Sequence, residues 1–498
     1  MKPRVKFQMF AFLTILMFIA AMFLYSCNAN ENSDKTVDGN LKDDASVAEV
    51  TTEPEIPDNL PEKDFGGYNF RLYLDEGGFK DIFIEEEVGE IVDDAVYRRN
   101  KTIEERFNIT FSTVLHNSEW SRGMDGSKSI NAGDDAFDLM RTHARIAYQY
   151  VAQGMVVDWL ESMPFVALNA VWWNQDVNND STMFNKLYCA AGDISYRGLS
   201  TTFCMIFNKN IFQALGLDYP YDDVVNGTWT LDKFLSLVKN GAADLDGDGT
   251  MTPESDRYGL EVGNVWNYPT SILYCGGDRV IAKGDDDIPV LAVYNERTID
   301  IFEKFFEVLN AGSVCIGGEN GSAWANPSTI EVFKNGRALF THGGMGAIVA
   351  LRDMEEEIGI VPTPKYDENT PKYYGLVEAY GGLLTVPVTV TDFERTSIIT
   401  EALCAEGYKI VIPAYYEKAL KTKYARDDES EAMLDYIKDS AVYDYGYMNH
   451  TLAGDPLSSI GANLVQTKNP NITSVYEKNV AKAQKNIDTF VEKMSSME

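Results

Sequence analysis

Three aspartates stand at alternate positions in the stretch DLDGDGTMTPESD, namely Asp244, Asp246 and Asp248, and a glycine follows the third. Alternate carboxylates can turn toward one cation, and glycine permits the sharp turn of such a loop. Ligands that are all oxygen favour Ca²⁺ over zinc or copper. No histidine or nucleophile pattern accompanies the loop. The spacing therefore predicts a structural calcium site that braces the loop, not a catalytic metal.

The exit of this loop departs from the EF-hand pattern, in which a bidentate glutamate stands at position 12. Ser255 occupies that position, so the closing ligand stays open. The alternative is a solvated acidic turn, which an acidic chain produces by chance. The expected metal ligands are Asp244, Asp246, Asp248, Thr250 through its backbone carbonyl, Glu254 and Asp256.

Catalytic motifs are absent from the sequence, which contains no nucleophile elbow, no HExxH and no phosphate-binding loop. With four histidines in the chain, catalysis through histidine has few candidates. The chain carries 76 Asp and Glu, so chance pairs of carboxylates are inevitable and are no evidence for glycoside hydrolysis. We therefore expect a protein that is not an enzyme, and a surface glycoside hydrolase is the alternative.

The formal net charge of −33 argues against nucleic-acid binding, because an acidic surface repels phosphates. A positively charged start precedes an apolar run of signal-peptide type, which ends in LYSC at Cys27. This ending resembles the lipobox of bacterial lipoproteins, and a transmembrane helix is the alternative. We expect a signal peptide over residues 1–26, lipid on Cys27 and a disordered acidic stalk over residues 27–65.

The remaining five cysteines are odd in number and show no CxxC or zinc spacing. Most of them lie in apolar runs, where cysteine usually behaves as a small buried hydrophobe. The sequence does not predict whether any two of them form a disulfide.

Strand and helix patterns alternate along the rest of the chain, as in α/β proteins. A helix is expected from Leu231, with Thr230 as its N-cap and Phe234, Leu235 and Val238 continuing its apolar stripe. Strands are expected within residues 68–74, 110–115, 136–143, 201–207, 332–344, 357–366 and 380–390, and further helices over residues 93–109, 392–420 with a break at Pro413, and 469–494.

Several segments occur in a telling order: MIFNKNIFQALGL, GTWTLDKF, the Asp-rich loop ending in DRYGL, FKNGRALF and GIVPTPK. They follow the lipobox, the stalk and an α/β layer. This order resembles bacterial extracellular solute-binding proteins of ABC importers, in the family 1 group that binds sugars and oligosaccharides. The resemblance covers most of residues 66–420, whereas residues 408–498 depart from the simpler family pattern.

The resemblance implies an α/β fold of the type II periplasmic-binding-protein kind, with two lobes joined by crossing strands. Lobe I would comprise residues 66–202 and 362–406, and lobe II residues 203–361 and 407–498. The crossings would fall near residues 201–207, 358–364 and 405–410.

The same resemblance implies a function in transport. A solute, most simply an oligosaccharide, would be held between the lobes and delivered to the permease subunits of an ABC transporter. The protein would be a monomer, tethered by its lipid to the extracellular face of the cell membrane or within the periplasm. A sensor or adhesin of the same fold that does not serve transport is an alternative.

Sugar-binding clefts combine aromatic faces, which cover the C–H faces of a pyranose, with polar groups that meet its hydroxyls. Such residues are expected on loops that follow strands and face the junction of the lobes. Core aromatics, a satisfied loop histidine and solvated turn acids are the plainer alternatives for the same positions. The candidate ligand-binding residues are Asp75, Glu76, Thr142, His143, Arg145, Asn264, Trp266, Tyr268, Trp324, His342 and Tyr380.

Overall fold

The computed structural model describes residues 56–116, 120–263, 265–266, 268–284, 287–317, 331–424 and 427–495. The chain divides into two compact units, Met1–Pro57 and Asp58–Glu498. Only Ile56 and Pro57 of the first unit are described, so the expected signal peptide, Cys27 and most of the expected stalk lie outside the described residues. Within the described residues, no helix is long and apolar enough to cross a membrane.

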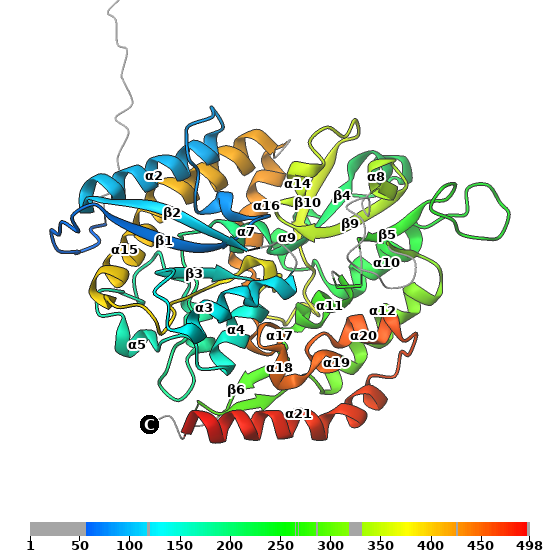
Figure 1. The fold of residues 1–498 in the computed structure, drawn as a ribbon. Coiled ribbons are helices and arrows are strands. Elements are labelled where there is room, and N and C mark those ends of the chain that lie inside the picture. Colours follow the sequence, from blue (N-terminus) through cyan, green and yellow to red (C-terminus); the bar gives the residue numbers. More distant parts are fainter. Residues whose placement is uncertain are drawn as a thin grey trace, which may run out of the picture. The chain divides into compact units, whose positions relative to one another are not determined.

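The first sheet of the second unit runs in the order β12-β3-β1-β2 over the described residues. Strands β1, β2 and β3 are parallel, and β12 is antiparallel to β3. Helices α2 and α15 cover one face of this sheet and α3 and α4 the other (Figure 1). We call these elements the first lobe: β1 Tyr68–Asp75, β2 Ile109–His116, β3 Leu139–Thr142, β12 Leu383–Thr385, α2 Ile91–Phe107, α3 Ser127–Ala132, α4 Ala144–Ala152 and α15 Phe393–Glu406.

The second sheet runs in the order β10-β4-β9-β5-β8 over the described residues. Its strands β9, β5 and β8 are parallel, and β4 runs antiparallel to both β9 and β10. We call these elements the second lobe: β4 Phe203–Asn208, β5 Tyr258–Val262, β8 Val314–Ile316, β9 Ala338–Gly344, β10 Ile358–Pro362, α8 Lys209–Leu215, α9 Tyr221–Asn226, α10 Leu231–Gly241, α11 Tyr268–Ser271, α12 Glu296–Asn310, α13 Glu331–Lys334 and α14 Ala347–Ala350.

The remaining elements connect the lobes or extend them. The C-terminal helix α21 lies along α18 and α19, and contacts α12 and β7 (Figure 1). These elements are α5 Trp159–Ser162, α6 Gln175–Ser181, α7 Arg197–Ser200, β6 Ile281–Lys283, β7 Pro289–Leu291, β11 Gly375–Leu376, α16 Asp428–Asp439, β13 Ala441–Val442, α17 Tyr445–Met448, α18 His450–Ala453, α19 Asp455–Ser458, α20 Ile460–Gln466 and α21 Ile472–Ser495.

The apolar stripe expected on the helix from Leu231 is confirmed, because Leu231, Phe234, Leu235 and Val238 are all buried. Thr230 stands at the N-cap position with extended backbone angles, but its side chain makes no capping hydrogen bond. The helix is instead held by burial of its apolar face against the second sheet.

Pro413 does not break the helical segment after α15, contrary to the expectation from the sequence. The chain continues through π-helical turns at Gly407–Val411 and Ala414–Tyr424 on either side of it. A proline removes one backbone donor, and the wider π-helical turns accommodate its ring without ending the helix.

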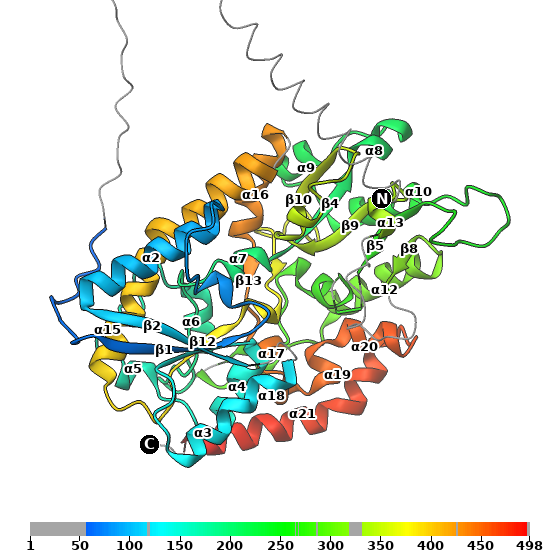
Figure 2. The same cartoon turned by 45° about the horizontal axis from the view of Figure 1, so that its top comes forward.

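The chain passes between the two sheets at several points. β4 begins the second sheet directly after α7. Residues 407–424 pack on α2 of the first lobe, and the following helix α16 packs on β10 of the second lobe (Figure 2). The expected lobe boundaries and crossing positions stay predictions.

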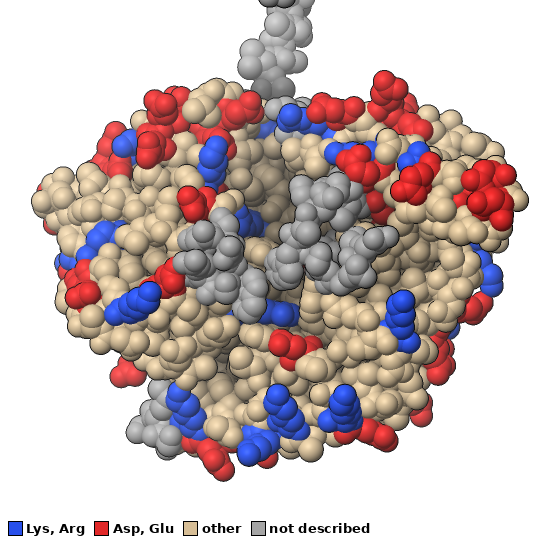
Figure 3. Space-filling view, turned by 45° about the vertical axis from the view of Figure 1, so that its right-hand side comes forward, with Lys and Arg blue, Asp and Glu red and all other residues tan. Residues whose placement is uncertain are grey.

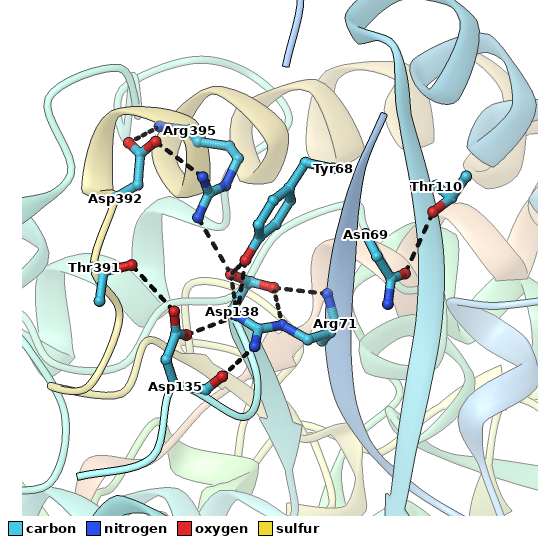
Figure 4. A network of polar contacts seen from close by, with 9 residues as sticks. All are labelled: Tyr68, Asn69, Arg71, Thr110, Asp135, Asp138, Thr391, Asp392 and Arg395. Carbon is cyan, nitrogen blue, oxygen red and sulfur yellow. Dashed lines mark hydrogen bonds and ion pairs between the residues drawn. The ribbon is translucent and has the colours of Figure 1, made fainter. Parts of the chain in front are cut away.

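A buried carboxylate ties three segments of the first lobe together (Figure 4). Asp138 is fully buried and accepts hydrogen bonds from the backbone N–H of Arg71 at 2.8 Å, from its Nε at 2.9 Å and from the Tyr68 hydroxyl at 2.8 Å. The guanidinium of Arg395 on α15 lies 3.5 Å from the centroid of the Tyr68 ring and 3.9 Å from Asp138. One carboxylate thus fixes β1, the entry to β3 and the start of α15.

We predict that Asp138→Ala lowers the free energy of unfolding by about 2–4 kcal/mol, because four hydrogen bonds from Arg71 and Tyr68 lose their acceptor and Arg395 loses a nearby buried carboxylate. Urea unfolding of the purified protein measures this change. Asp94→Ala is a milder comparison, since Asp94 accepts only from exposed backbone N–H groups. Equal effects of the two substitutions would contradict the assignment.

Glu261 on β5 is buried, and its carboxylate accepts the backbone N–H of Phe333 at 2.7 Å. Burial raises the pKa of Glu261 to about 7. The folded state therefore holds a proton on this group at pH values where the unfolded chain has released it. Stability from this group is complete below pH ~4.5 and is lost as the pH rises through about 7.

We predict that Glu261→Gln removes this pH dependence. Between pH 4.5 and 7.5 the wild type should lose about 2–3 kcal/mol more unfolding free energy than Glu261→Gln. Urea unfolding at both pH values measures the difference, and Glu303→Gln at an exposed position of α12 is the matched control. Parallel pH profiles for the wild type and Glu261→Gln would refute the prediction.

Candidate functional site

The candidate site lies at the carboxyl ends of the parallel strands in the first sheet. In the first lobe, Asp75 ends β1 and Thr142 ends β3 on a neighbouring parallel strand. Leu383, which begins β12, pairs with Thr142, so the preceding residues 378–382 reach the same edge. Carboxyl ends of parallel strands, where loops leave the sheet, are the usual place for ligands in α/β folds. Figure 3 shows a hollow on the face that it draws, with Lys or Arg side chains inside it and acidic side chains along its upper rim.

Two arginines and two aspartates form an ion-pair cluster at the edge of the first sheet. Arg197 lies 3.6 Å from Asp75 and 3.9 Å from Asp81, and Arg141 lies 2.6 Å from Asp81. Arg141 also donates to the carbonyl of Gly78 at 2.6 Å. The two arginines balance the charge of the two aspartates. The cluster therefore carries no net charge, which suits an uncharged ligand.

Gly78 leaves room for this cluster, because a Cβ atom there would lie 1.5 Å from Nη2 of Arg197 and would displace its guanidinium. Reasoning from the sequence singled out Asp75 but missed Arg141, Arg197 and Asp81. The Gly-Gly pair after β1 was the one feature of the sequence that could have indicated a close contact at this edge. It does not reveal which side chain makes that contact.

His143 and Tyr380 meet at this edge although they are far apart in sequence. Their rings lie edge to face with centroids 4.6 Å apart. Nδ1 of His143 accepts the backbone N–H of Arg145 at 3.2 Å, which caps α4 and leaves Nε2 as the donor. Burial lowers the pKa of His143 to about 3, so the imidazole is neutral at physiological pH. The pair offers a sugar-sized ligand one aromatic ring and one neutral donor.

Glu378 fixes the position of Tyr380. Its carboxylate accepts the backbone N–H of Tyr380 at 2.6 Å and the hydroxyl of Tyr447 at 3.2 Å. Burial raises the pKa of Glu378. Arg145 lies over the ring of Tyr447 and donates to Ser459 at 2.9 Å, so its side chain binds the C-terminal helices to the first lobe.

In the second lobe, Trp266 is half-buried after the end of β5 and stays a predicted ligand contact. Asn264 and Trp324 lie outside the described residues. Glu76 is exposed, next to the buried Asp75, and Thr142 is fully buried.

Tyr268 and His342 lie in the core of the second lobe. Tyr268 is fully buried against Phe234 and Phe305, and its ring centroid is 5.1 Å from that of His342. Nε2 of His342 bonds Ser271 at 3.0 Å, and burial lowers its pKa to about 3. The sequence suggested a loop after ALF, but β9 continues through Gly344, which places the imidazole of His342 inside the sheet.

The Asp-rich loop lies away from these residues, after α10. Carboxylate oxygens of Asp244, Asp246 and Asp256 come within 4.8 Å of one another. Asp256 is buried and accepts the backbone N–H groups of Leu245 and Thr252, which hold its pKa below the usual range. Asp248 accepts the backbone N–H of Thr250 at 2.7 Å. At the exit of the loop, Asp256 is the residue that lies near Asp244 and Asp246, whereas Glu254 is exposed.

We predict that His143 and His342 remain neutral from pH 5 to pH 8, because both imidazoles are desolvated. NMR titration of ring resonances, assigned with His143→Gln and His342→Gln, checks this. The same histidines in urea-unfolded protein should titrate near pH ~6.5 and serve as the control. Titration of His143 near that value in the folded protein would show that its ring is open to water.

Comparison with known proteins identifies the fold of this chain through solved structures. No protein-family model matches the chain, and no curated protein matches it. Solved structures do match. The GacH receptor of Streptomyces glaucescens GLA.O, whose structures include complexes with acarbose and an acarbose homolog, is 12% identical with a TM-score of 0.55, over 85% of this chain and 99% of that one.

Two further matches extend this picture. An ABC substrate-binding protein from Listeria monocytogenes in complex with cycloalternan is 12% identical with a TM-score of 0.53, over 86% of this chain and 99% of that one. UgpB from Mycobacterium tuberculosis in complex with glycerophosphocholine is 12% identical with a TM-score of 0.56, over the same shares. The chain therefore has the α/β fold of ABC substrate-binding proteins, with a sheet in each of two lobes.

Proposed function

We propose that the chain is the substrate-binding component of an ABC importer and captures an oligosaccharide between its lobes without transforming it. The observation that carries the proposal is the edge at which His143 and Tyr380 meet, within a fold shared with proteins solved with acarbose and cycloalternan. A neutral donor and an aromatic ring suit the hydroxyls and C–H faces of a sugar.

The electrostatics of the site support an uncharged ligand. Asp75 and Asp81 are balanced by Arg141 and Arg197, and the net charge of the chain disfavours anionic sugars. The buried imidazole of His143 has too low a pKa to act as an acid at neutral pH. Acid catalysis by this histidine is therefore disfavoured, whereas a glycoside hydrolase, which uses carboxyl groups, is tested by the assay for turnover below.

Transport requires that the ligand favour a closed arrangement of the lobes, which a permease then recognises. In this proposal Cys27 carries lipid, the segment up to residue 65 is the tether, and the protein works outside the cell membrane as a monomer. A sensor of the same fold that lacks a permease is the second candidate, and co-purification with permease subunits separates the two.

We predict that Trp266→Ala and Tyr380→Ala each weaken sugar binding by about ten-fold or more, because each removes an aromatic face at the junction. Isothermal titration calorimetry with maltotetraose, acarbose and cycloalternan measures this, with glycerophosphocholine and a tripeptide as non-sugar ligands. Tyr97→Ala, on the far surface of α2, is the matched control.

The melting temperature of the two variants should stay within a few degrees of the wild type, since neither side chain is fully buried. Binding of the tripeptide alone would overturn the sugar proposal. Hydrolysis of a glycoside by the purified protein would support the enzyme instead.

The proposal includes a structural Ca²⁺ at Asp244, Asp246 and Asp256, with Asp248 and the carbonyl of Thr250 as further ligands. The convergence of the three carboxylates supports it, and the loop would then be braced at the end of α10. The expected dissociation constant is about 10⁻⁴–10⁻³ M, as in extracellular modules.

We predict that Ca²⁺ at ten times its dissociation constant stabilises the protein by about 1.4 kcal/mol and raises its melting temperature. Asp244→Asn should abolish the shift, and Asp218→Asn, at an exposed position between α8 and α9, should retain it. A calorimetric titration without heat, together with an unchanged melting temperature, would leave the solvated acidic turn as the explanation.

A further inference from the structure

A second cavity, of about 310 Å³, lies beside the ion-pair cluster. Arg141 of that cluster is part of its lining, whereas Asp75, His143 and Tyr380 are not. The rest of the lining comes from segments that are distant in sequence: residues 190–195, Thr202, Gly381, Gly382, Leu384, Tyr408, Ile412 and residues within 438–443. A molecule held there would touch the first lobe and the segment that follows α16.

Asp193 lines this cavity, and Lys438 is the charged neighbour that acts on its carboxylate. Within the described residues this carboxylate makes no hydrogen bond and no ion pair, although the backbone N–H of Asp193 donates to the carbonyl of Trp172 at 2.9 Å. Burial raises the pKa of Asp193 to about 7. A desolvated carboxylate without a partner is costly unless a cation or a donor meets it.

The neighbours of Asp193 add an aromatic wall and a second polar group. Trp173, Tyr408 and Tyr443 line the same cavity, and the hydroxyl of Tyr443 makes no hydrogen bond within the described residues. Lys438 and Asp439 contribute one charge of each sign. The Lys438 ammonium lies 5.0 Å from the centroid of the Tyr416 ring and forms no ion pair with Asp193 in the described chain.

Close backbone approaches fix the shape of the cavity. A Cβ atom at Gly407 would lie 2.0 Å from the carbonyl oxygen of Asp193, so only glycine lets the π-helical turn lie against this segment. A Cβ atom at Gly198 would lie 2.2 Å from the hydroxyl of Tyr443. The carboxylate and the hydroxyl are therefore held in place by backbone contacts.

We infer that this cavity is a second binding site, for a small organic amine whose ammonium group meets the carboxylate of Asp193 and the hydroxyl of Tyr443 while its apolar body packs on Trp173 and Tyr408. Aromatic rings combined with a carboxylate are a general arrangement for binding organic cations. The volume suits a compact molecule of this kind.

The site would regulate the proposed capture of sugar, and this part of the inference rests on the proposed function. Arg141 and Leu384 of the first lobe line the cavity together with residues after α16, which packs on β10 of the second lobe, so movement of the lobes would change its volume. An amine that binds one arrangement better shifts the equilibrium toward it, and by linkage the sugar must change the affinity for the amine by the same factor.

The test uses benzylamine on the full chain without sugar, with benzyl alcohol as its uncharged counterpart. Isothermal titration calorimetry should show benzylamine binding to the wild type. Asp193→Asn should weaken it by about ten-fold or more, and Tyr443→Phe by a smaller factor. Asp218→Asn, an isosteric change at an exposed position, should bind benzylamine as the wild type does, and benzyl alcohol should bind weakly to every variant.

Absence of benzylamine binding by the wild type, or equal binding by Asp193→Asn, overturns the inference. A second titration, of maltotetraose with the amine present, tests the coupling: an unchanged sugar affinity would overturn the regulatory part. Amine binding that depends on Asp193, in a protein that binds no sugar, would uphold the cavity as an amine site and remove only the proposed transport function.

Discussion

The pairing of β12 with β3 is the constraint on which the site depends. The second sheet has been completed by the time the chain returns to the first, and Leu383 pairs beside Thr142. That register brings Glu378 and Tyr380 to the edge where His143 begins α4. Gly382, with a φ of 74°, turns the chain into the strand where a Cβ atom would lie 2.7 Å from Arg141. A register shift of one residue would separate His143 from Tyr380.

Charge is handled differently in the cleft and in the interior. At the cleft edge every nearby carboxylate of the ion-pair cluster has an arginine, so the surface there is polar but balanced. Asp138 uses the same device in the interior of the first lobe. Asp193 is the exception, because it faces a cavity without an arginine or lysine in ion-pair distance within the described residues. An ion-pair cluster without net charge suits a neutral ligand, and a carboxylate without an ion pair suits a cation.

The sequence predicted the regular elements well, because they are encoded locally. The apolar stripe of α10 and the buried face of α2, with Val96, Ile103 and Phe107, follow from helical periodicity. His342 was misjudged as a loop residue because the glycines that suggested a turn continue the strand to Gly344. Pro413 was misjudged because proline signals a break locally, whereas packing on α2 sustains the segment as π-helical turns.

The site itself could be predicted only in part. Sequence reasoning could propose Asp75, His143 and Tyr380, because ligands usually bind near the ends of strands in α/β folds. Arg141 and Arg197 were not, since an ion pair between distant segments leaves no trace in spacing. The same holds for the cavity at Asp193, because its lining comes from segments that are far apart in the sequence.

Small-angle X-ray scattering of the full chain with and without a saturating sugar tests the central claim most directly, because capture between two lobes must change their separation. We predict a smaller radius of gyration with a sugar that binds by calorimetry, and a smaller decrease for Tyr380→Ala when the sugar is near the dissociation constant of the wild type. Superimposable profiles for the free and fully liganded wild type would contradict it.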